Sequence, residues 1–123
     1  MSRIGLARAH RRAHRRAMSE ALVYRICSQE EWRAAREAGE VAPNADDRRD
    51  GFIHLSARDQ LAETVRRHYG GRDDLLVLEI DAAALGDTLK WEPSRGGALF
   101  PHVHGPLPTS AVRAARTLAE ALA

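Results

Sequence analysis

The chain has 123 residues, of which 44% are hydrophobic and 29% charged, a length and composition typical of one globular domain. It contains no run of about eighteen apolar residues, so the sequence predicts no membrane span. The formal net charge is +2, but the positive charge is concentrated at one end of the chain.

Residues 1–19 contain six arginines and no acidic residue, whereas residues 20–123 contain thirteen basic and seventeen acidic residues, a formal charge of −4. We therefore expect a basic N-terminal tail at 1–19, disordered or the product of a mis-assigned start before Met18, and one domain at 20–123. An organelle transit peptide is the alternative for the tail. An acidic domain does not attract phosphate backbones, so we expect no nucleic-acid partner. Without a long apolar run we expect no membrane partner either.

Cys27 is the only cysteine, which excludes a disulfide within the chain and is typical of a reducing compartment. The N-terminus also lacks the apolar segment of a secretory signal. We therefore expect a cytoplasmic protein in which Cys27 is a small buried residue rather than a nucleophile.

The first half of the domain alternates between strand and helix patterns. The apolar residues 22–26 predict a buried strand. Ser28 and Glu31 predict a capping box at the start of a helix, which Gly39 ends. The polar segment 40–50 is predicted to be a loop with solvated charges.

The next two strands flank a helix. A strand is predicted at 51–55, and Ser56 is expected to cap the helix that follows. That helix has an apolar stripe at helical spacing, formed by Leu61, Val65 and Tyr69. The apolar run 75–80 predicts the most buried strand of the domain.

Two further strands are predicted in the C-terminal part. Asp81 is expected to cap a helical turn, and the alternating residues 88–92 predict a half-buried strand. Residues 98–104 predict another strand, which Pro101 places at a sheet edge because proline cannot donate to a strand ladder.

The C-terminal segment has two interpretations. Residues 111–123 form either a helix throughout, or a short strand at Val112 followed by a helix. Together the elements predict a single compact α+β domain, with two small mixed or antiparallel sheets and flanking helices.

Alternation along the strands places the polar residues on shared faces. His54 and Ser56 share one face of their strand, and His102 and His104 share one face of theirs. If the sheet is bent or split, these faces converge on a histidine-lined cleft.

Histidine titrates near neutrality, so His54 and His102 are candidates for acid/base catalysis. The alternative for His54 is a half-buried ring that is bonded to a backbone carbonyl. His102 and His104 can chelate a metal ion at this spacing, with His54 as a third ligand. Because no cysteine or carboxylate cluster lies near them in the sequence, we assign no metal ligand.

Two charged residues lie beside or within apolar strand segments. Glu92 is the strongest carboxylate candidate, because the apolar neighbour Trp91 is expected to raise its pKa; a solvated glutamate is the alternative. Arg25 interrupts an apolar strand and therefore needs a partner. We expect an internal carboxylate, Glu79 or Asp81, or a bound phosphate that fits the guanidinium group.

The order of these motifs is similar to that of a known family. The matching segments are Val23 to Ile26, the GFIHLS sequence at 51–56, residues 76–81, Trp91 to Pro93, and the LFPHVHGPL sequence at 99–107. In this order they resemble the small bacterial family called domain of unknown function 952 (DUF952), over about residues 21–115.

This resemblance implies a fold similar to that of the ADP-ribosyltransferases, in which two small sheets flank a cleft for NAD. Those enzymes hold the dinucleotide with a first-strand arginine or histidine, and they polarise the ribose with a glutamate. Arg25 stands at the first position, and Glu92 is the late-strand glutamate of this chain. Members of the family commonly carry histidine at the position of Arg25 and tyrosine at that of His104.

The sequence therefore predicts an enzyme that resembles ADP-ribosyltransferases and binds NAD or a related nucleotide. Arg25 would contact phosphate, and His54 and Ser56 would position the ribose. Glu92 or His102 would stabilise the developing charge or move a proton. The catalytic candidates are Glu92, His102 and His54. The ligand-binding candidates are Arg25, Ser56, His104 and Tyr24.

Two other functions remain as alternatives. One is a non-catalytic module that keeps the cleft and binds a small anionic ligand or a partner protein, which the acidic domain favours. The other is a metal-dependent hydrolase that uses His54, His102 and His104.

Overall fold

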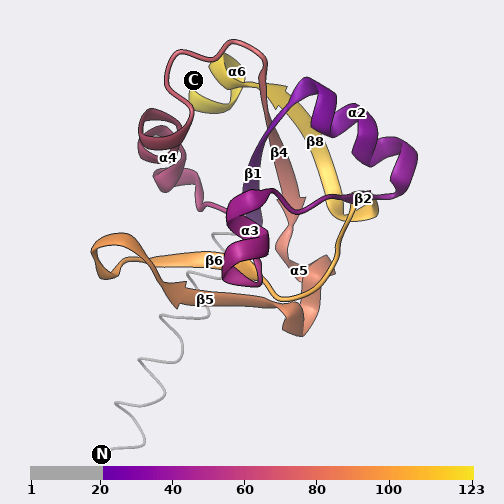
Figure 1. The fold of residues 1–123 in the computed structure, drawn as a ribbon, viewed down its shortest axis with the longest axis vertical. Helices are drawn as coiled ribbons and strands as arrows, with labels where there is room; N and C mark the ends of the chain where they lie inside the picture. Colours follow the sequence, from indigo (N-terminus) through magenta and orange to yellow (C-terminus); the bar gives the residue numbers. More distant parts are fainter. Residues whose placement is uncertain (1–20) are drawn as a thin grey trace, which may run out of the picture.

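The structure is a computed structural model that describes residues 21–123, with only the backbone described at Arg95. The expectations for the tail at 1–19 lie outside this part of the chain. Within the described part, strands and helices combine into an α+β fold, as the sequence predicts (Figure 1). No helix in that part is long and apolar enough to cross a membrane.

The strands of the described chain are all paired antiparallel. They are β1 (Leu22–Ser28), β2 (Glu40–Val41), β3 (Ile53–His54), β4 (Leu75–Asp81), β5 (Leu89–Pro93), β6 (Leu99–Val103), β7 (Leu107–Pro108) and β8 (Val112–Thr117). One three-stranded sheet has the order β1-β4-β8, and another has the order β3-β6-β5. A short β2–β7 pair adds a third sheet to the two that the sequence predicts.

Short helices connect the strands. The α-helices are α2 (Gln29–Ala38), α3 (Ala45–Asp50), α4 (Leu61–His68), α5 (Ala82–Leu85) and α6 (Leu118–Leu122). Single 3₁₀ turns are η1 (Arg58–Gln60), η2 (Gly86–Thr88), η3 (Arg95–Gly97) and η4 (Thr109–Ala111). In Figure 1, α2 and α4 flank the β1-β4-β8 sheet from opposite sides, and the β5–β6 hairpin crosses beneath it.

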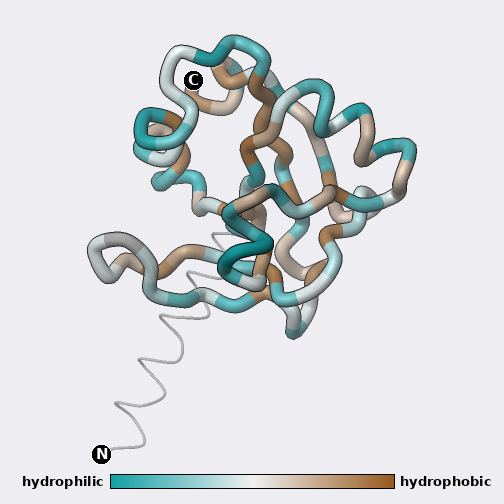
Figure 2. Tube along the Cα trace, viewed as in Figure 1, coloured by the Kyte–Doolittle hydropathy of each residue, from teal (hydrophilic) through white to brown (hydrophobic). Residues whose placement is uncertain are grey.

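Strand β4 is the centre of the core, as its apolar run predicts. Leu78 and Ile80 pack on one face of the sheet with Val23, whereas Val77 packs on the other face with Tyr24. The brown stretches along β1 and β4 in Figure 2 mark these apolar residues, and the charged residues Arg25 in β1 and Glu79 in β4 interrupt them. A strand that is buried on both faces needs apolar residues at consecutive positions, which explains the pattern.

The predicted helix caps at α2 and α5 are confirmed. Ser28 accepts a hydrogen bond from the Glu31 amide, and Glu31 accepts one from the Ser28 amide. Gly39 ends α2 with a φ of 86°, a conformation that costs glycine no steric energy. Asp81 accepts a hydrogen bond from the Ala83 amide at the start of α5.

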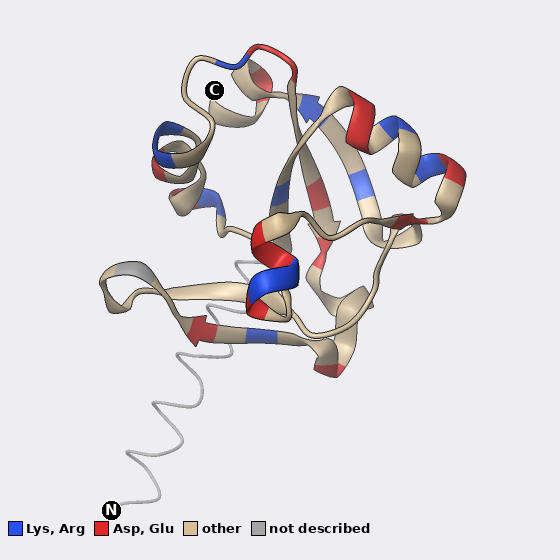
Figure 3. Cartoon of the chain, viewed as in Figure 1, with Lys and Arg blue, Asp and Glu red and all other residues tan. Residues whose placement is uncertain are grey.

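The prediction of a loop at 40–50 is wrong. This segment contains strand β2 and helix α3, which is capped by Asn44 at its start and by Gly51 at its end. Asn44 and Asp47 form a second capping box, and Gly51 has a φ of 84°. The many charged residues of α3, seen together in Figure 3, conceal these helix signals in a polar segment.

Ser56 does not cap a helix, as the sequence predicts it should. Its backbone instead forms a two-way bridge with Tyr24, with N–O distances of 2.9 and 2.8 Å. The bridge joins β1, the edge strand of one sheet, to the chain that leaves β3 in the other. The turn η1 begins after Ala57 and not after Ser56, and the Ala57 amide donates a hydrogen bond to the Gln60 side chain.

The predicted edge position of Pro101 is also wrong, because β6 is the central strand of its sheet. The Pro101 carbonyl accepts a hydrogen bond from the Leu55 amide at 3.0 Å. Proline has no amide to return that bond, and the β3–β6 ladder ends there at His54 and His102. The partner strand β3 has only two residues, so it needs no hydrogen bond from the position of Pro101, and the central strand β6 tolerates the proline.

At the C-terminus, the interpretation of a strand followed by a helix is confirmed. Strand β8 pairs with β4, and Thr117 caps the final helix α6 with Glu120 in a capping box. The final helix packs its buried Ala121 against the face of the sheet that Val77 occupies.

Candidate functional site

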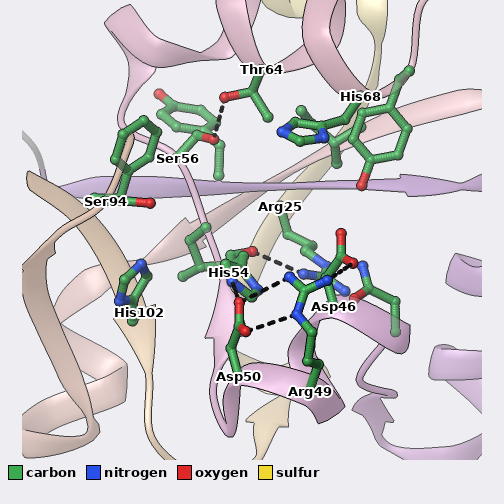
Figure 4. A pocket seen from close by; sticks show the side chains of 16 residues that line it. Arg25, Asp46, Arg49, Asp50, His54, Ser56, Thr64, His68, Ser94 and His102 are labelled. Atoms are coloured by element: carbon green, nitrogen blue, oxygen red, sulfur yellow. Dashed lines mark hydrogen bonds and ion pairs between the residues drawn. The ribbon is translucent and has the colours of Figure 1, made fainter. Parts of the chain in front are cut away.

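A cavity of about 280 Å³ opens where the two three-stranded sheets meet, beside the Tyr24–Ser56 bridge (Figure 4). Five of the residues that the sequence singles out line it. They are Tyr24, Arg25, His54, Ser56 and His102. The expectation that a split sheet forms a histidine-lined cleft agrees with this cavity, whose opposite wall comes from α4 and the residues next to it.

Several lining residues do not appear among the sequence candidates. Tyr69 and Phe100 add aromatic surface, Thr64 adds a hydroxyl group, and Arg49 and Asp50 add charges from α3. The Ser56 hydroxyl donates to the Thr64 hydroxyl at 3.3 Å. Aromatic rings with a few hydroxyl and charged groups are typical of a small-molecule pocket.

Asp47 of α3 organises the charged side of the cavity, although the sequence analysis does not identify it. Its carboxylate is fully buried and accepts hydrogen bonds from both terminal nitrogens of Arg25, at 3.3 and 2.7 Å. It also accepts the backbone amide of His54 at 3.0 Å. The signal that could have found it is the Asn44 capping box, which places Asp47 in the first turn of a helix.

Arg25 is 3% exposed, and its Nη1 also donates to the His54 carbonyl at 2.8 Å. The internal carboxylate expected for Arg25 is confirmed, but the two residues named for it are wrong, since Glu79 pairs with Arg116 and Asp81 with Arg113. Arg25 lies opposite Leu78 in the sheet, so Glu79 points to the other face. Its Nε is buried without a hydrogen-bond partner among the described residues.

His54 bridges two carboxylates of α3. Its Nδ1 lies 2.7 Å from Asp47 and its Nε2 lies 2.9 Å from Asp50. A carboxylate only accepts hydrogen bonds, so both contacts are satisfied only by the doubly protonated ring. Hydrogen bonding to Asp47 accordingly raises the pKa of His54, against the opposing effect of burial.

The same contacts act on Asp47. Burial favours its neutral form, but the hydrogen bonds from His54 and Arg25 outweigh burial and hold the pKa of the carboxyl well below its usual range. Asp47 therefore places a buried carboxylate between the Arg25 guanidinium and the His54 ring. This arrangement holds α3 against β1 and β3.

A second cluster lies on the β5–β6 hairpin. One oxygen of Glu92, Oε1, lies 2.8 Å from His102 Nδ1 and 2.7 Å from His104 Nε2. Phe52 stacks on the His102 ring with 4.0 Å between centroids. The structure therefore brings Glu92, His102 and His104 together, as strand alternation predicts for the two histidines. Glu92 and His104 do not line the cavity.

The expected rise in the pKa of Glu92 is wrong. Hydrogen bonds from His104 and His102 stabilise the carboxylate and hold the pKa of Glu92 below its usual range. The neighbour Trp91 lies on the other face of the strand and packs against the core. Burial lowers the pKa of His102, against the opposing effect of Glu92.

Cys27 is buried, and burial raises the pKa of its thiol to about 12. The thiolate is the nucleophilic form, so this residue is inert near neutral pH. The sequence-based expectation of a small buried cysteine is confirmed.

Solved structures from Caulobacter crescentus resemble this fold. The crystal structure of protein CC0527 has a TM-score of 0.74 and 46% identity, and the match covers 78% of this chain and 84% of that one. A crystal structure of its double mutant has a TM-score of 0.74 and 45% identity, over the same shares of the two chains. The solution NMR structure of CC0527 has a TM-score of 0.72 and 46% identity, over 80% of this chain and 84% of that one.

No functionally curated protein matches this chain. A family model described as "Protein of unknown function (DUF952)" matches residues 26–115, which is most of the chain. The family predicted from the GFIHLS and LFPHVHGPL segments is thereby confirmed, and the chain belongs to the DUF952 family.

Proposed function

We propose that this chain binds NAD or a related nucleotide in the cavity between its sheets and acts on it in the manner of an ADP-ribosyltransferase. The observation that carries the proposal is the convergence of Tyr24, Arg25, His54, Ser56 and His102 on one cavity. They come from three separate segments of the chain, so their convergence does not follow from closeness in sequence.

The volume of the cavity limits how much of a ligand it can hold. About 280 Å³ lies just below the range for small-molecule pockets, which is roughly 300–1,000 Å³. One half of a dinucleotide fits this space, with the remainder outside the mouth. Tyr69 and Phe100 supply ring faces for a base, and Ser56 and Thr64 supply hydroxyl groups for a ribose.

The charges suggest where a phosphate lies. Both terminal nitrogens of Arg25 are held by Asp47, so we give Arg25 a supporting role rather than direct phosphate contact. Arg49 is the cation that a phosphate at the mouth would meet, because its side chain is exposed and a phosphate can replace its solvent-accessible partners Asp46 and Asp50. Both ring nitrogens of His54 are held by carboxylates, so His54, like Arg25, has a supporting role.

His102 is the group that we propose to act on the bond between ribose and base. Its Nδ1 is held by Glu92, which leaves Nε2 as the nitrogen available to a ligand. In this role His102 moves a proton or donates to the leaving group. Glu92 is a positioning residue, because it contacts His102 and does not line the cavity.

The binding step is tested by thermal unfolding of the EDTA-treated full chain with NAD, ADP-ribose or nicotinamide. A ligand at a hundredfold excess over its Kd stabilises the protein by about 2.7 kcal/mol, which raises Tm by several degrees. Phe100→Ala should weaken binding about tenfold or more through lost stacking. Leu99→Ala, an exposed neighbour that does not line the cavity, is the matched control.

Turnover is tested by nicotinamide release from NAD. Glu92→Gln keeps an oxygen that accepts from both histidines but removes the charge, so it should reduce release at least tenfold and leave binding intact. Binding without release would instead support the non-catalytic module. The absence of a Tm shift with all three compounds would overturn the nucleotide proposal.

A further inference from the structure

The side chains of Glu92, His102 and His104 converge on one point beside the β5–β6 hairpin. Glu92, His102 and His104 each offer one ligand atom within 4.8 Å of the others, and Glu92 Oε1 contacts both His102 Nδ1 and His104 Nε2. His102 is 3% exposed, whereas the side chains of Glu92 and His104 are about one-third exposed. The cluster is therefore anchored in the fold on one side and open to solvent on the other.

We propose that Glu92, His102 and His104 form a binding site for a divalent first-row transition metal ion, with Zn²⁺ as the probe. Two imidazoles and one carboxylate are the ligands that such ions prefer, and three protein ligands leave coordination positions open. This site goes beyond the nucleotide cavity, since Glu92 and His104 do not line it.

The distances suit an ion. Ligand atoms of a tetrahedral zinc site, each about 2.0–2.1 Å from the metal, lie about 3.3 Å apart. The two contacts to Glu92 Oε1 are 2.7 and 2.8 Å, so each needs to open by only about half an ångström, while the ligand atoms of the two histidines lie within 4.8 Å and need to approach each other. Rotation of the partly buried Glu92 and the exposed His104 side chains can supply that movement without a change in the strands.

The backbone holds the ligands in place. Glu92 is paired with Phe100 in the β5–β6 ladder, and His102 is paired between Lys90 and His54. The His104 amide donates to the Thr88 carbonyl at 2.8 Å. Ligands on paired strands lose little freedom when an ion binds.

The residues around His102 hold its ring in the orientation that a metal ion at Nδ1 requires. Phe52 stacks on its ring at 4.0 Å and fixes the ring plane. Nδ1 faces Glu92, so an ion bound there leaves Nε2 for a ligand in the cavity. Residues that orient a metal-binding histidine generally strengthen the site.

His54 does not belong to this site. The sequence instead suggests His54 as the third ligand beside His102 and His104. Both of its ring nitrogens are bonded to carboxylates of α3, Asp47 and Asp50. Glu92, ten residues before His102, replaces it. The two sets of ligands therefore make different predictions for mutants.

The test is isothermal titration of the EDTA-treated full chain with Zn²⁺, without nucleotide, and with Co²⁺ absorption as a second readout of coordination. We expect one ion per chain. Altering a residue that only orients a metal ligand costs about 10–100-fold in affinity, so His104→Asn and Glu92→Gln should cost at least tenfold. Glu92→Gln keeps its two hydrogen-bond contacts, which separates loss of the metal from loss of the fold.

Two controls should retain the wild-type affinity. His54→Gln removes a histidine whose ring centroid lies 5.6 Å from that of His102. The double variant His10→Gln/His14→Gln removes the tail histidines. The proposal is overturned if the wild type binds no stoichiometric ion, or if His104→Asn binds as tightly as the wild type. Because no nucleotide is present, either result leaves the nucleotide proposal to its own test.

Discussion

Asp47 is the residue on which the charged wall of the cavity depends. It is buried, and it contacts Arg25, the His54 ring and the His54 amide. A buried ion pair contributes little net stability, but removing one partner leaves the other charge unpaired and is strongly destabilising. The cluster therefore specifies how α3 docks against β1 and β3.

His54 makes the stability of the fold dependent on pH. Its pKa is raised in the folded state, mainly by Asp47, so its contribution is fully present below its unfolded pKa of about 6.5. That contribution is lost as pH rises through the folded pKa. The difference in free energy of unfolding between wild type and His54→Gln should therefore be larger at pH 6 than at pH 9, as measured by urea denaturation.

The comparison with His54→Gln is needed because the titration of neighbouring groups also changes the free energy of unfolding with pH, and some of these changes have the opposite direction. The lowered pKa of His102 decreases stability as pH falls below about 6.5. Asp47 and Asp50, whose pKa values are lowered, affect stability only at acidic pH. Both effects are largely shared by the two proteins. An equal difference at pH 6 and pH 9 would show that His54 is not held as an imidazolium.

At the scale of elements, helix α3 places the carboxylates that hold His54. It has only six residues, too few to be stable alone, so its caps and its contacts decide whether it forms. Asn44 accepts a hydrogen bond from the Asp47 amide at 2.9 Å, which ties the cap to the residue that organises the site.

Asn44→Ala should lower the free energy of unfolding by about 1 kcal/mol, the usual cost of a lost N-cap. It should also lower the pKa of the His54 ring, measured by NMR titration, because Asp47 would be less firmly placed. Thr117→Ala removes the equivalent cap from α6, which lies outside the site, and is the matched control. A pKa of His54 that changes equally in both variants would contradict this role of α3.

At the scale of the whole molecule, β4 is shared by both halves of the core. It is the central strand of its sheet and packs on both faces, against two separate apolar clusters. Strand β5, in contrast, is an edge strand and is half-buried. The described chain therefore consists of the central β1-β4-β8 sheet and a more peripheral β5–β6 hairpin, which carries Glu92 and His102.

Hydrogen exchange should report this difference. The amides of Val77 and Leu78 should exchange only on global unfolding, with opening free energies close to that of the whole domain. The amides of β5 should open with lower free energies. Native-state exchange measured by NMR checks this, and equal protection of β4 and β5 would mean that the hairpin and the central sheet unfold as one unit.

The sequence by itself determined the features that depend on near neighbours. Continuous apolar residues identified β4 as buried, and the pairing of Ser28 with Glu31 identified the start of α2. Cys27 was correctly placed inside the protein. Each of these follows from periodicity or from a hydrogen bond between residues a few positions apart, which the order of residues encodes directly.

Only the tertiary structure decided which side chains meet. Arg25 and Asp47 are 22 residues apart, and Glu92 and His102 are ten apart. Their contacts depend on how β1 docks against α3 and on the register of β5 against β6. Strand alternation placed His102 and His104 on one face, but the choice of Asp47 for Arg25, and of Glu92 rather than His54 for the two histidines, required the packed sheets. Docking and register arise from contacts across the whole core, so no local pattern carries them.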